Sequence, residues 1–240
     1  MTHDVSQALA FYGHVVGWTS EAMPMEGHTY QVLKAGGRGM GGVMQLSTRE
    51  MRAGWLGYVG SPDVDADLQR LERAGGTVQR PAMDIPHVGR FAPVCDPQGG
   101  AFLLFKPQPP PGEVPAAASG VGSVGWNELV TRDWEAAFAF YSELFGWTKG
   151  DTMDMGPMGT YQLFSVGAEP VGAMMNAPDA SAPASWLYYF TVESVGAALK
   201  RVTEKGGVVT HGPFEVPGPM WTLQCKDPEG TPFALVSAKP

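Results

Sequence analysis

The segment GWNELV, residues 125–130, contains one carboxyl group, one amide and one indole among apolar residues. Alternation along an extended strand predicts that Trp126 and Glu128 share one face, with Asn127 and Leu129 on the other. Apolar surroundings favour the protonated form of a carboxyl group, so Glu128 is a candidate general acid or base. Two other roles stay open for Glu128, an acid at the rim of a site or the partner of an arginine.

Composition narrows the classes of partner and compartment. The 240 residues include 16 basic and 24 acidic side chains, for a net charge of −8, which argues against nucleic acid or an anionic membrane as partner. No basic segment precedes an apolar run at the N-terminus, and no apolar run is long enough to span a membrane. Cys95 and Cys225 lie in no metal or redox motif, so we expect reduced structural thiols. We expect a soluble, cytoplasmic protein.

The chain contains a long internal repeat. Residues 2–19 and 131–148 are identical at nine of 18 aligned positions, and the alignment continues to Asp96 and Asp227. A period near 130 residues is too long for a solenoid, so we infer duplication of a whole domain. The segment KPQPPPGEVPAAASG contains five prolines and is typical of an extended spacer. We predict a first domain at residues 1–106, a Pro/Ala-rich linker at 107–120 and a second domain at 121–240.

Each copy is predicted to contain two helices and several short strands. Asp4 and Asp133 are good N-caps for helices with an apolar stripe, and Gly146 is a typical helix stop. Second helices are predicted at about residues 63–74 and 194–205. The β-rich segments are YQVL, GGVMQL, WLGYV, FAPVC and AFLLF in the first copy, and YQLFSV, VGAMM, WLYYFTV, WTLQC and PFALV in the second. This pattern predicts an α+β fold with helices on one side of a curved, open sheet.

The order of these motifs resembles the vicinal oxygen chelate superfamily, which includes glyoxalase I, bleomycin-resistance proteins and extradiol dioxygenases. The resemblance lies in D-x-x-x-A-x-A-F-Y…G-W after Asp4 and Asp133, D-V-D-A…G-G from Asp63, and D-P-x-G at Asp96 and Asp227. It implies two tandem domains, each of paired βαβββ units around an open cup. The segment DIPHVGRFA, residues 84–92, suggests the tandem-domain bacterial branch called glyoxalase-like.

The resemblance also implies that the first copy lacks its first strand. In the second copy, WNELV precedes the repeated segment that begins at Arg132. In the first copy, only Met1 and Thr2 precede the same segment, which begins at His3. The first domain is therefore predicted to be N-terminally incomplete. Either the natural chain begins upstream or another segment fills the gap. In the first case, adding an upstream extension should raise stability. The second copy is the better candidate for an intact site.

Superfamily enzymes hold a divalent ion at four positions in the cup. In the second copy these correspond to Trp126, Leu187, Ala234 and a position within 173–176, where only Asn176 is polar. The first copy offers Leu56, Leu103 and Gln45, and the five histidines lie outside these segments. Carbon side chains cannot ligate a hard cation, so we expect no bound metal and no other cofactor.

A cup without an ion can still bind a small molecule. The predicted lining residues are Trp126, Leu187, Tyr189, Met174 and Ala234 in the second copy, and Tyr58 in the first. Loops at the two mouths add His87, Arg90 and Trp221, with His87 and Arg90 suited to an anionic group. The alternative is that these aromatic and apolar side chains are simply core and the loops are surface lids.

These observations favour a metal-independent, glyoxalase/bleomycin-resistance-like protein that binds a hydrophobic or aromatic small molecule. One alternative is a glyoxalase-type lyase or isomerase that acts on methylglyoxal or a related dicarbonyl, with Glu128 as the proton carrier. Another is a scaffold without a small-molecule site. Whether the protein is an enzyme stays open at this point. The expected partner is a small-molecule ligand, with neither nucleic acid nor membrane, and a homodimer is possible.

Overall fold

The computed structural model describes residues 1–25, 28–86, 88–108 and 119–240. The chain forms two compact units, and each unit combines segments from both copies of the repeat. Unit 1 consists of Met1–Trp55, Ala117–Trp126 and Leu187–Pro240, and unit 2 of Leu56–Ala116 and Asn127–Trp186. Most of the predicted linker lies outside the described residues, and so does His87. The predicted domain boundaries at residues 106 and 121 mark the two sequence copies, which differ from the compact units.

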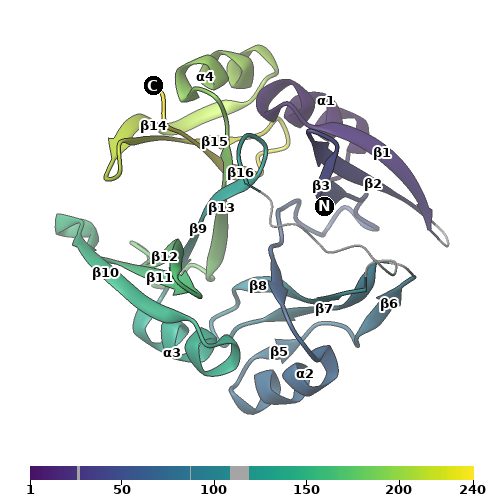
Figure 1. Cartoon of the computed structure of the whole chain (residues 1–240), viewed down its shortest axis with the longest axis vertical. Coiled ribbons are helices and arrows are strands. Elements are labelled where there is room, and N and C mark those ends of the chain that lie inside the picture. Colours follow the sequence, from purple (N-terminus) through teal and green to yellow (C-terminus); the bar gives the residue numbers. More distant parts are fainter. Residues whose placement is uncertain (26–27, 87, 109–118) are drawn as a thin grey trace. The chain divides into compact units, whose positions relative to one another are not determined.

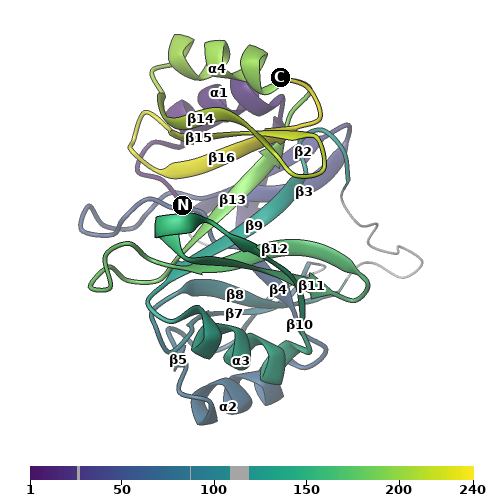
Figure 2. The same cartoon turned by 90° about the vertical axis from the view of Figure 1, so that its left-hand side faces the viewer.

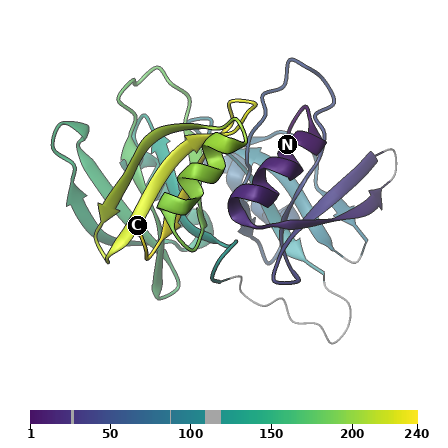
Figure 3. The ribbon, with the colours of Figure 1, turned by 90° about the horizontal axis from the view of Figure 1, so that it is seen from above.

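Unit 1 contains two helices and two sets of strands. In strand order, one sheet is β1-β2-β3 and the other set is β13-β16-β15-β14 (Figure 1). The helices are α1 (Val5–Val16) and α4 (Val195–Glu204), and the strands are β1 (Thr19–Met25), β2 (His28–Ala35), β3 (Arg38–Val43), β13 (Ser185–Thr191), β14 (Val208–Val216), β15 (Met220–Lys226) and β16 (Pro232–Ser237). The helices α1 and α4 lie side by side (Figure 2), and α4 lies across the strands β14, β15 and β16 (Figure 3).

Unit 2 has the same kinds of elements. Its strands run in the orders β4-β8-β7-β5, with β6 paired to β7, and β10-β11-β12-β9. The helices are α2 (Val64–Arg73) and α3 (Trp134–Phe145), with a short 3₁₀ turn at Gly156–Met158; the strands are β4 (Tyr58–Gly60), β5 (Thr77–Val78), β6 (Met83–Ile85), β7 (Gly89–Cys95), β8 (Ala101–Pro107), β9 (Val124–Thr131), β10 (Thr148–Asp154), β11 (Thr160–Val166) and β12 (Glu169–Asn176). The strands β9 and β13 each pass from one unit into the other.

The predicted helix signals are confirmed. Asp4 accepts a hydrogen bond from the backbone N–H of Gln7 at 2.9 Å, and Asp133 accepts one from Ala136 at 3.0 Å. Because the first N–H groups of a helix have no intrahelical acceptor, such a carboxylate fixes where the helix begins. Gly146 adopts the left-handed conformation, with φ of 70°, that ends α3.

The α+β class and the repeated βαβββ pattern are confirmed as well. In the second copy the chain order is β9-α3-β10-β11-β12 followed by β13-α4-β14-β15-β16. In the described residues of the first copy the order is α1-β1-β2-β3 followed by β4-α2-β5-β6-β7-β8; no strand precedes α1, and the short strands β5 and β6 take the place of the single strand β14. None of the described helices is long and apolar enough to cross a membrane. Both cysteines are free, as expected, and Cys225 is buried.

A single backbone bridge marks where β9 would continue in the first copy. Thr2 and Gln45 form an isolated parallel bridge, and their repeat equivalents Thr131 and Asn176 form the last pair of the β9–β12 ladder. The neighbouring strand is also shorter, since β4 has three residues and its counterpart β13 has seven. At this place the described residues of the first copy thus pair less extensively than those of the second.

In each unit, a buried hydrogen bond between a tyrosine and an aspartate joins the two copies of the repeat. In unit 1 the Tyr12 hydroxyl donates to Asp227 at 3.1 Å and accepts from Trp55 Nε1 at 2.9 Å. In unit 2, Tyr141 donates to Asp96 at 3.0 Å and accepts from Trp186 Nε1 at 3.3 Å. Each tyrosine thus pairs with the Asp-Pro motif of the other copy. The D-P-x-G motif is a structural connector between the copies.

Candidate functional site

An apolar cluster on β13 and β16 gathers several of the predicted lining residues in unit 1. Tyr189, Ala234 and Val236 form its buried centre. The partly buried side chains packed against them are Trp126, Leu187 and Met220. The structure therefore brings together Trp126, Leu187, Tyr189 and Ala234, as strand alternation predicts.

One row across three strands of this cluster carries a polar pair. Ala234 on β16 pairs with Tyr189 on β13 and with Gln224 on β15. The side-chain amide of Gln224 donates to the Tyr189 hydroxyl at 2.9 Å. The methyl group of Ala234 is small enough to let the two longer side chains meet above it. The row thus combines an apolar surface with an amide and a phenol.

The equivalent row of the first copy, in unit 2, has a different composition. Leu103 on β8 pairs with Tyr58 on β4 and with Pro93 on β7. Tyr58 is 49% exposed, and its ring lies edge-on to Phe105 at 5.2 Å between centroids. A proline has no side-chain donor or acceptor, and a leucine fills the central position. The amide–phenol pair is thus confined to the row of the second copy.

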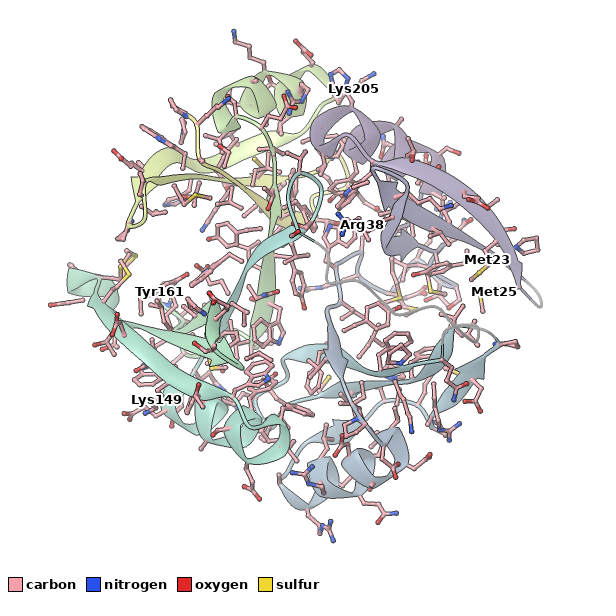
Figure 4. The ribbon with its side chains drawn as sticks, in the orientation of Figure 1. Met23, Met25, Arg38, Lys149, Tyr161 and Lys205 are labelled. Carbon is pink, nitrogen blue, oxygen red and sulfur yellow. The ribbon has the colours of Figure 1, made fainter. Side chains whose placement is uncertain are left out.

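A second candidate, in unit 2, is the buried carboxyl group of Glu128 on β9. Only 7% of Glu128 is exposed, and its Oε2 accepts a hydrogen bond from the Tyr161 hydroxyl at 2.9 Å. Figure 4 labels Tyr161 on β11. Ala173 lies opposite Glu128 in the ladder between β9 and β12. A buried carboxyl beside a phenol over a small apolar side chain is suited to moving or holding a proton.

Met174 does not share the Glu128 face. It pairs with Leu129, is fully buried, and belongs to the hydrophobic core of unit 2. Since successive strand residues point to opposite faces, Met175 is the methionine on the Glu128 side. The prediction that Met174 lines the open face is therefore wrong in its placement.

The predicted loop residues are dispersed. Arg90 donates to both carboxylate oxygens of Asp65 at 2.8 and 2.7 Å and to Asp84 at 2.8 Å. These hydrogen bonds raise the pKa of Arg90, whose charge is already balanced by two carboxylates. An anionic ligand would have to compete with them, which corrects the expectation of a free anion-binding group. Trp221 pairs with Ser237, next to the pair of Thr222 and Val236. Alternation therefore places Trp221 on the face opposite Val236.

The positions at which superfamily enzymes hold a metal ion do not fit one here. Trp126, Leu187 and Ala234 belong to the apolar cluster and offer no oxygen or neutral nitrogen ligand. The amide oxygen of Asn176 accepts a hydrogen bond from the backbone of Trp134 at 2.9 Å, at the start of α3. Within the described ranges, no group of three or more His, Cys, Asp or Glu side chains could hold a metal ion.

Sequence reasoning missed three residues of these two candidate sites, Tyr161, Gln224 and Met220. Alternation within YQLFSV and WTLQC was a signal available for the first two. Identifying them also required the strand register, which pairs Gln224 with Ala234 and Tyr161 with Met175. Register depends on the partner strand, so one strand's own sequence does not reveal it.

Comparison with known proteins assigns the family. Residues 123–235 match the model of the Glyoxalase/Bleomycin resistance protein/Dioxygenase superfamily. The chain is 31% identical over 253 residues to the anthracycline biosynthesis protein DnrV of Streptomyces peucetius, covering 98% of this chain and 90% of that protein. It is 28% identical over 244 residues to CFP32 of Mycobacterium tuberculosis, provisionally named a glyoxylase, covering 100% of this chain and 92% of that protein. The chain belongs to this superfamily.

Solved structures show the same fold at low sequence identity. The Mn(II)-bound glyoxalase from Novosphingobium aromaticivorans superimposes with a TM-score of 0.67 at 18% identity, covering 99% of this chain and 79% of that one. The 2,3-dioxygenase LapB from Pseudomonas sp. KL28 gives a TM-score of 0.65 at 15% identity, covering 99% and 89%. At such identities the likeness concerns the fold alone.

Proposed function

We propose that the protein binds a hydrophobic or aromatic small molecule without a metal ion. The observation that carries this proposal is the apolar cluster of Trp126, Leu187 and Ala234, residues at the positions where superfamily enzymes have metal ligands. An indole and a phenol beside aliphatic side chains offer stacking and dispersion contacts to a planar ligand. Two or three polar groups on such a surface are enough to orient a small molecule.

The names of the relatives are consistent with this ligand class. DnrV and its Streptomyces sp. counterpart DauV, which is 30% identical over 253 residues, are both named for anthracycline biosynthesis. Anthracyclines contain a planar, fused aromatic ring system. This supports an aromatic ligand for the present chain and leaves open whether the ligand is transformed or only held.

A calorimetric titration with 2-methoxynaphthalene, with and without chelator, tests the proposal. We expect saturable binding that chelator does not change, and a loss of about tenfold in affinity in Trp126→Ala because the ring contact is removed. Trp134→Ala is the matched control, since Trp134 belongs to α3 of unit 2, where its ring contacts Lys149. Binding that requires Mn²⁺ or Zn²⁺ would contradict metal independence. No binding of any aromatic probe would favour the scaffold alternative.

A second candidate function rests on Glu128. Its burial and its hydrogen bond with Tyr161 are suited to isomerising the hydrate that methylglyoxal or a related dicarbonyl forms with water: the carboxylate takes the C1 proton beside the ketone and returns it to C2, which gives the 2-hydroxy acid. In this function Glu128 carries the proton and Tyr161 holds the carboxyl group in place.

Turnover of methylglyoxal, followed by NMR, tests that candidate. Glu128→Gln should lower the rate by about 10²- to 10⁴-fold, the usual range for a general acid–base group. Tyr161→Phe should cause a smaller loss and shift the pH profile of the rate. Full turnover in Glu128→Gln would exclude this role for Glu128.

A further inference from the structure

The row of Tyr189, Ala234 and Gln224 is the polar part of the apolar cluster. Its three side chains come from strands that are adjacent in the order β13-β16-β15 (Figure 1). The strand register places Ala234 between the other two. Tyr189 is buried in the cluster, while Gln224 is partly exposed at its edge. The hydrogen bond between them therefore connects the buried aromatic surface to a polar group that a ligand can reach.

The amide of Gln224 has hydrogen-bonding capacity beyond this contact. Within the described part of the chain, its side chain makes one hydrogen bond, from Nε2 to the Tyr189 hydroxyl at 2.9 Å. A primary amide has two N–H donors and a carbonyl acceptor, so one donor and the acceptor Oε1 can serve another group. The contact with Tyr189 limits the rotation of the amide and so lowers the entropy lost when a ligand binds.

The apolar side chains that the ring would contact favour a neutral ligand group. The residues of the cluster, Trp126, Leu187, Met220 and Val236 together with the row itself, include no ionisable acid or base that is charged at neutral pH. A carboxylate or phosphate would lose its hydration there without gaining a counter-charge, which is costly. A neutral hydroxyl can donate to Oε1 and accept from Nε2, so it matches both functions of the amide.

The first copy offers an internal comparison. Its equivalent row, Tyr58, Leu103 and Pro93, keeps the tyrosine but has no amide and no small central residue. The same fold therefore forms this row without a polar pair. This indicates that the Gln224 amide is not required for the strands to pair.

We infer that Gln224 recognises a hydroxyl group on a neutral aromatic ligand, with Tyr189 as the residue that positions its amide. This inference rests on the proposed function and specifies its ligand class as a phenol or naphthol. The aromatic ring packs on the apolar cluster, and the hydroxyl lies at the row above Ala234.

Three probes separate ring binding from hydroxyl recognition: 2-naphthol, 2-methoxynaphthalene and naphthalene. Only 2-naphthol has a donor for Oε1, while all three share the fused ring. We expect wild type to bind 2-naphthol about three- to tenfold more tightly than 2-methoxynaphthalene, the range for one net hydrogen bond. Gln224→Leu should remove this difference and leave the affinity for naphthalene unchanged or slightly higher. Gln79→Leu, an exposed glutamine of the first copy, should leave the difference intact.

The outcomes distinguish the inference from the function on which it rests. Equal binding of 2-naphthol and 2-methoxynaphthalene to wild type, or an unchanged preference in Gln224→Leu, overturns the hydroxyl recognition while the aromatic site stands. Failure of all three probes overturns both. A thermal melt of each variant shows whether it is folded; should Gln224→Leu fail to fold, Gln224→Met tests the same point, because it removes both the amide donor and the amide acceptor and keeps an unbranched side chain of similar length.

Discussion

At the scale of single residues, the carboxyl group of Asp227 is buried and accepts three hydrogen bonds. Its Oδ1 accepts hydrogen bonds from the backbone N–H groups of Glu229 and Thr231 at 3.0 and 2.9 Å, and its Oδ2 accepts from Tyr12. Burial nevertheless raises the pKa of Asp227, with the negative charge of Glu229 adding to the effect, while the hydrogen bonds act in the opposite direction. Folding of the chain is therefore less favourable when the Asp227 carboxyl group, which connects the two copies, is charged than when it is protonated.

This shift predicts a pH dependence of stability. A folded-state pKa above the unfolded value near 3.8 means that the folded chain binds the proton more tightly. The resulting stabilisation is complete below about pH 3.8 and is lost as the pH rises through the folded-state pKa. Asp227→Asn has no such proton, so the free energy of unfolding of wild type should fall relative to the variant as the pH rises from 3.8. Urea unfolding of both proteins across this range measures the difference, and a constant difference would contradict the prediction.

At the scale of elements, an arginine from one copy caps a helix of the other in each unit. Arg201 of α4 donates from Nε and Nη2 to the carbonyl oxygen of Val15 at 3.1 and 3.0 Å, in the last turn of α1. Its repeat equivalent Arg70 donates to the carbonyl of Glu143 at 2.9 Å, near the end of α3. The last carbonyl groups of a helix have no intrahelical donor, so the arginine satisfies one of them. Its positive charge also interacts favourably with the negative end of the helix dipole.

Removal of this cap should destabilise unit 1. We expect Arg201→Ala to lower the free energy of unfolding by about 1–2 kcal/mol, since the hydrogen bonds are to a charged donor that is partly exposed. Hydrogen exchange should accelerate first in the last turn of α1. Lys200→Ala, at the adjacent exposed position of the same helix, should change neither quantity. Equal effects of the two substitutions would show that helix propensity, and not the cap, accounts for the loss.

The single bridge between Thr2 and Gln45 leads to a second prediction at this scale. In the second copy, β12 pairs with β9 from Gly172 to Asn176, whereas among the described residues of the first copy the equivalent pairing is this one bridge at Gln45, just beyond the end of β3. Adding the sequence of residues 124–130 upstream of Thr2 should extend that ladder and raise the melting temperature. The same seven residues in scrambled order serve as the control, and an unchanged melting temperature would contradict strand addition.

At the scale of the whole molecule, each compact unit is built from halves of the two copies. The Tyr12–Asp227 and Tyr141–Asp96 bonds both join residues of different copies, and so do the two arginine caps. A copy taken alone therefore lacks the partners of its own tyrosine and its own Asp-Pro motif. The sequence repeat thus marks units of duplication, and we expect stability to depend on both copies together.

Expression of residues 119–240 alone tests this dependence. The fragment loses the partners of Tyr141 and Asp227, so we expect it to be unfolded as a monomer or to associate with a second fragment, with stability that rises with protein concentration. Sedimentation and thermal melts over a range of concentrations measure both effects. A folded monomer as stable as the full chain would show instead that residues 121–240 form an independent domain.

Much of the fold was predictable from the sequence because its signals are local. The N-cap aspartates Asp4 and Asp133, the terminating Gly146 and the apolar stripes act within a few residues, so they predict helices wherever they occur. The positions implied by the family resemblance, together with alternation within each strand, placed Trp126, Leu187, Tyr189 and Ala234 in one cluster. The prediction for Met174 was wrong, because adjacent strand residues lie on opposite faces and Met174 pairs with Leu129 on the core side.

The sequence by itself determined the duplication, the helix boundaries and the apolar character of the positions that the family resemblance assigns to metal ligands. Tertiary structure alone decided which residues meet: Gln224 with Tyr189, Tyr161 with Glu128, Arg90 with Asp65, and Tyr12 with Asp227. The physical reason is that these contacts join residues distant along the chain, and their geometry depends on strand register and on packing between the copies, which no local pattern encodes.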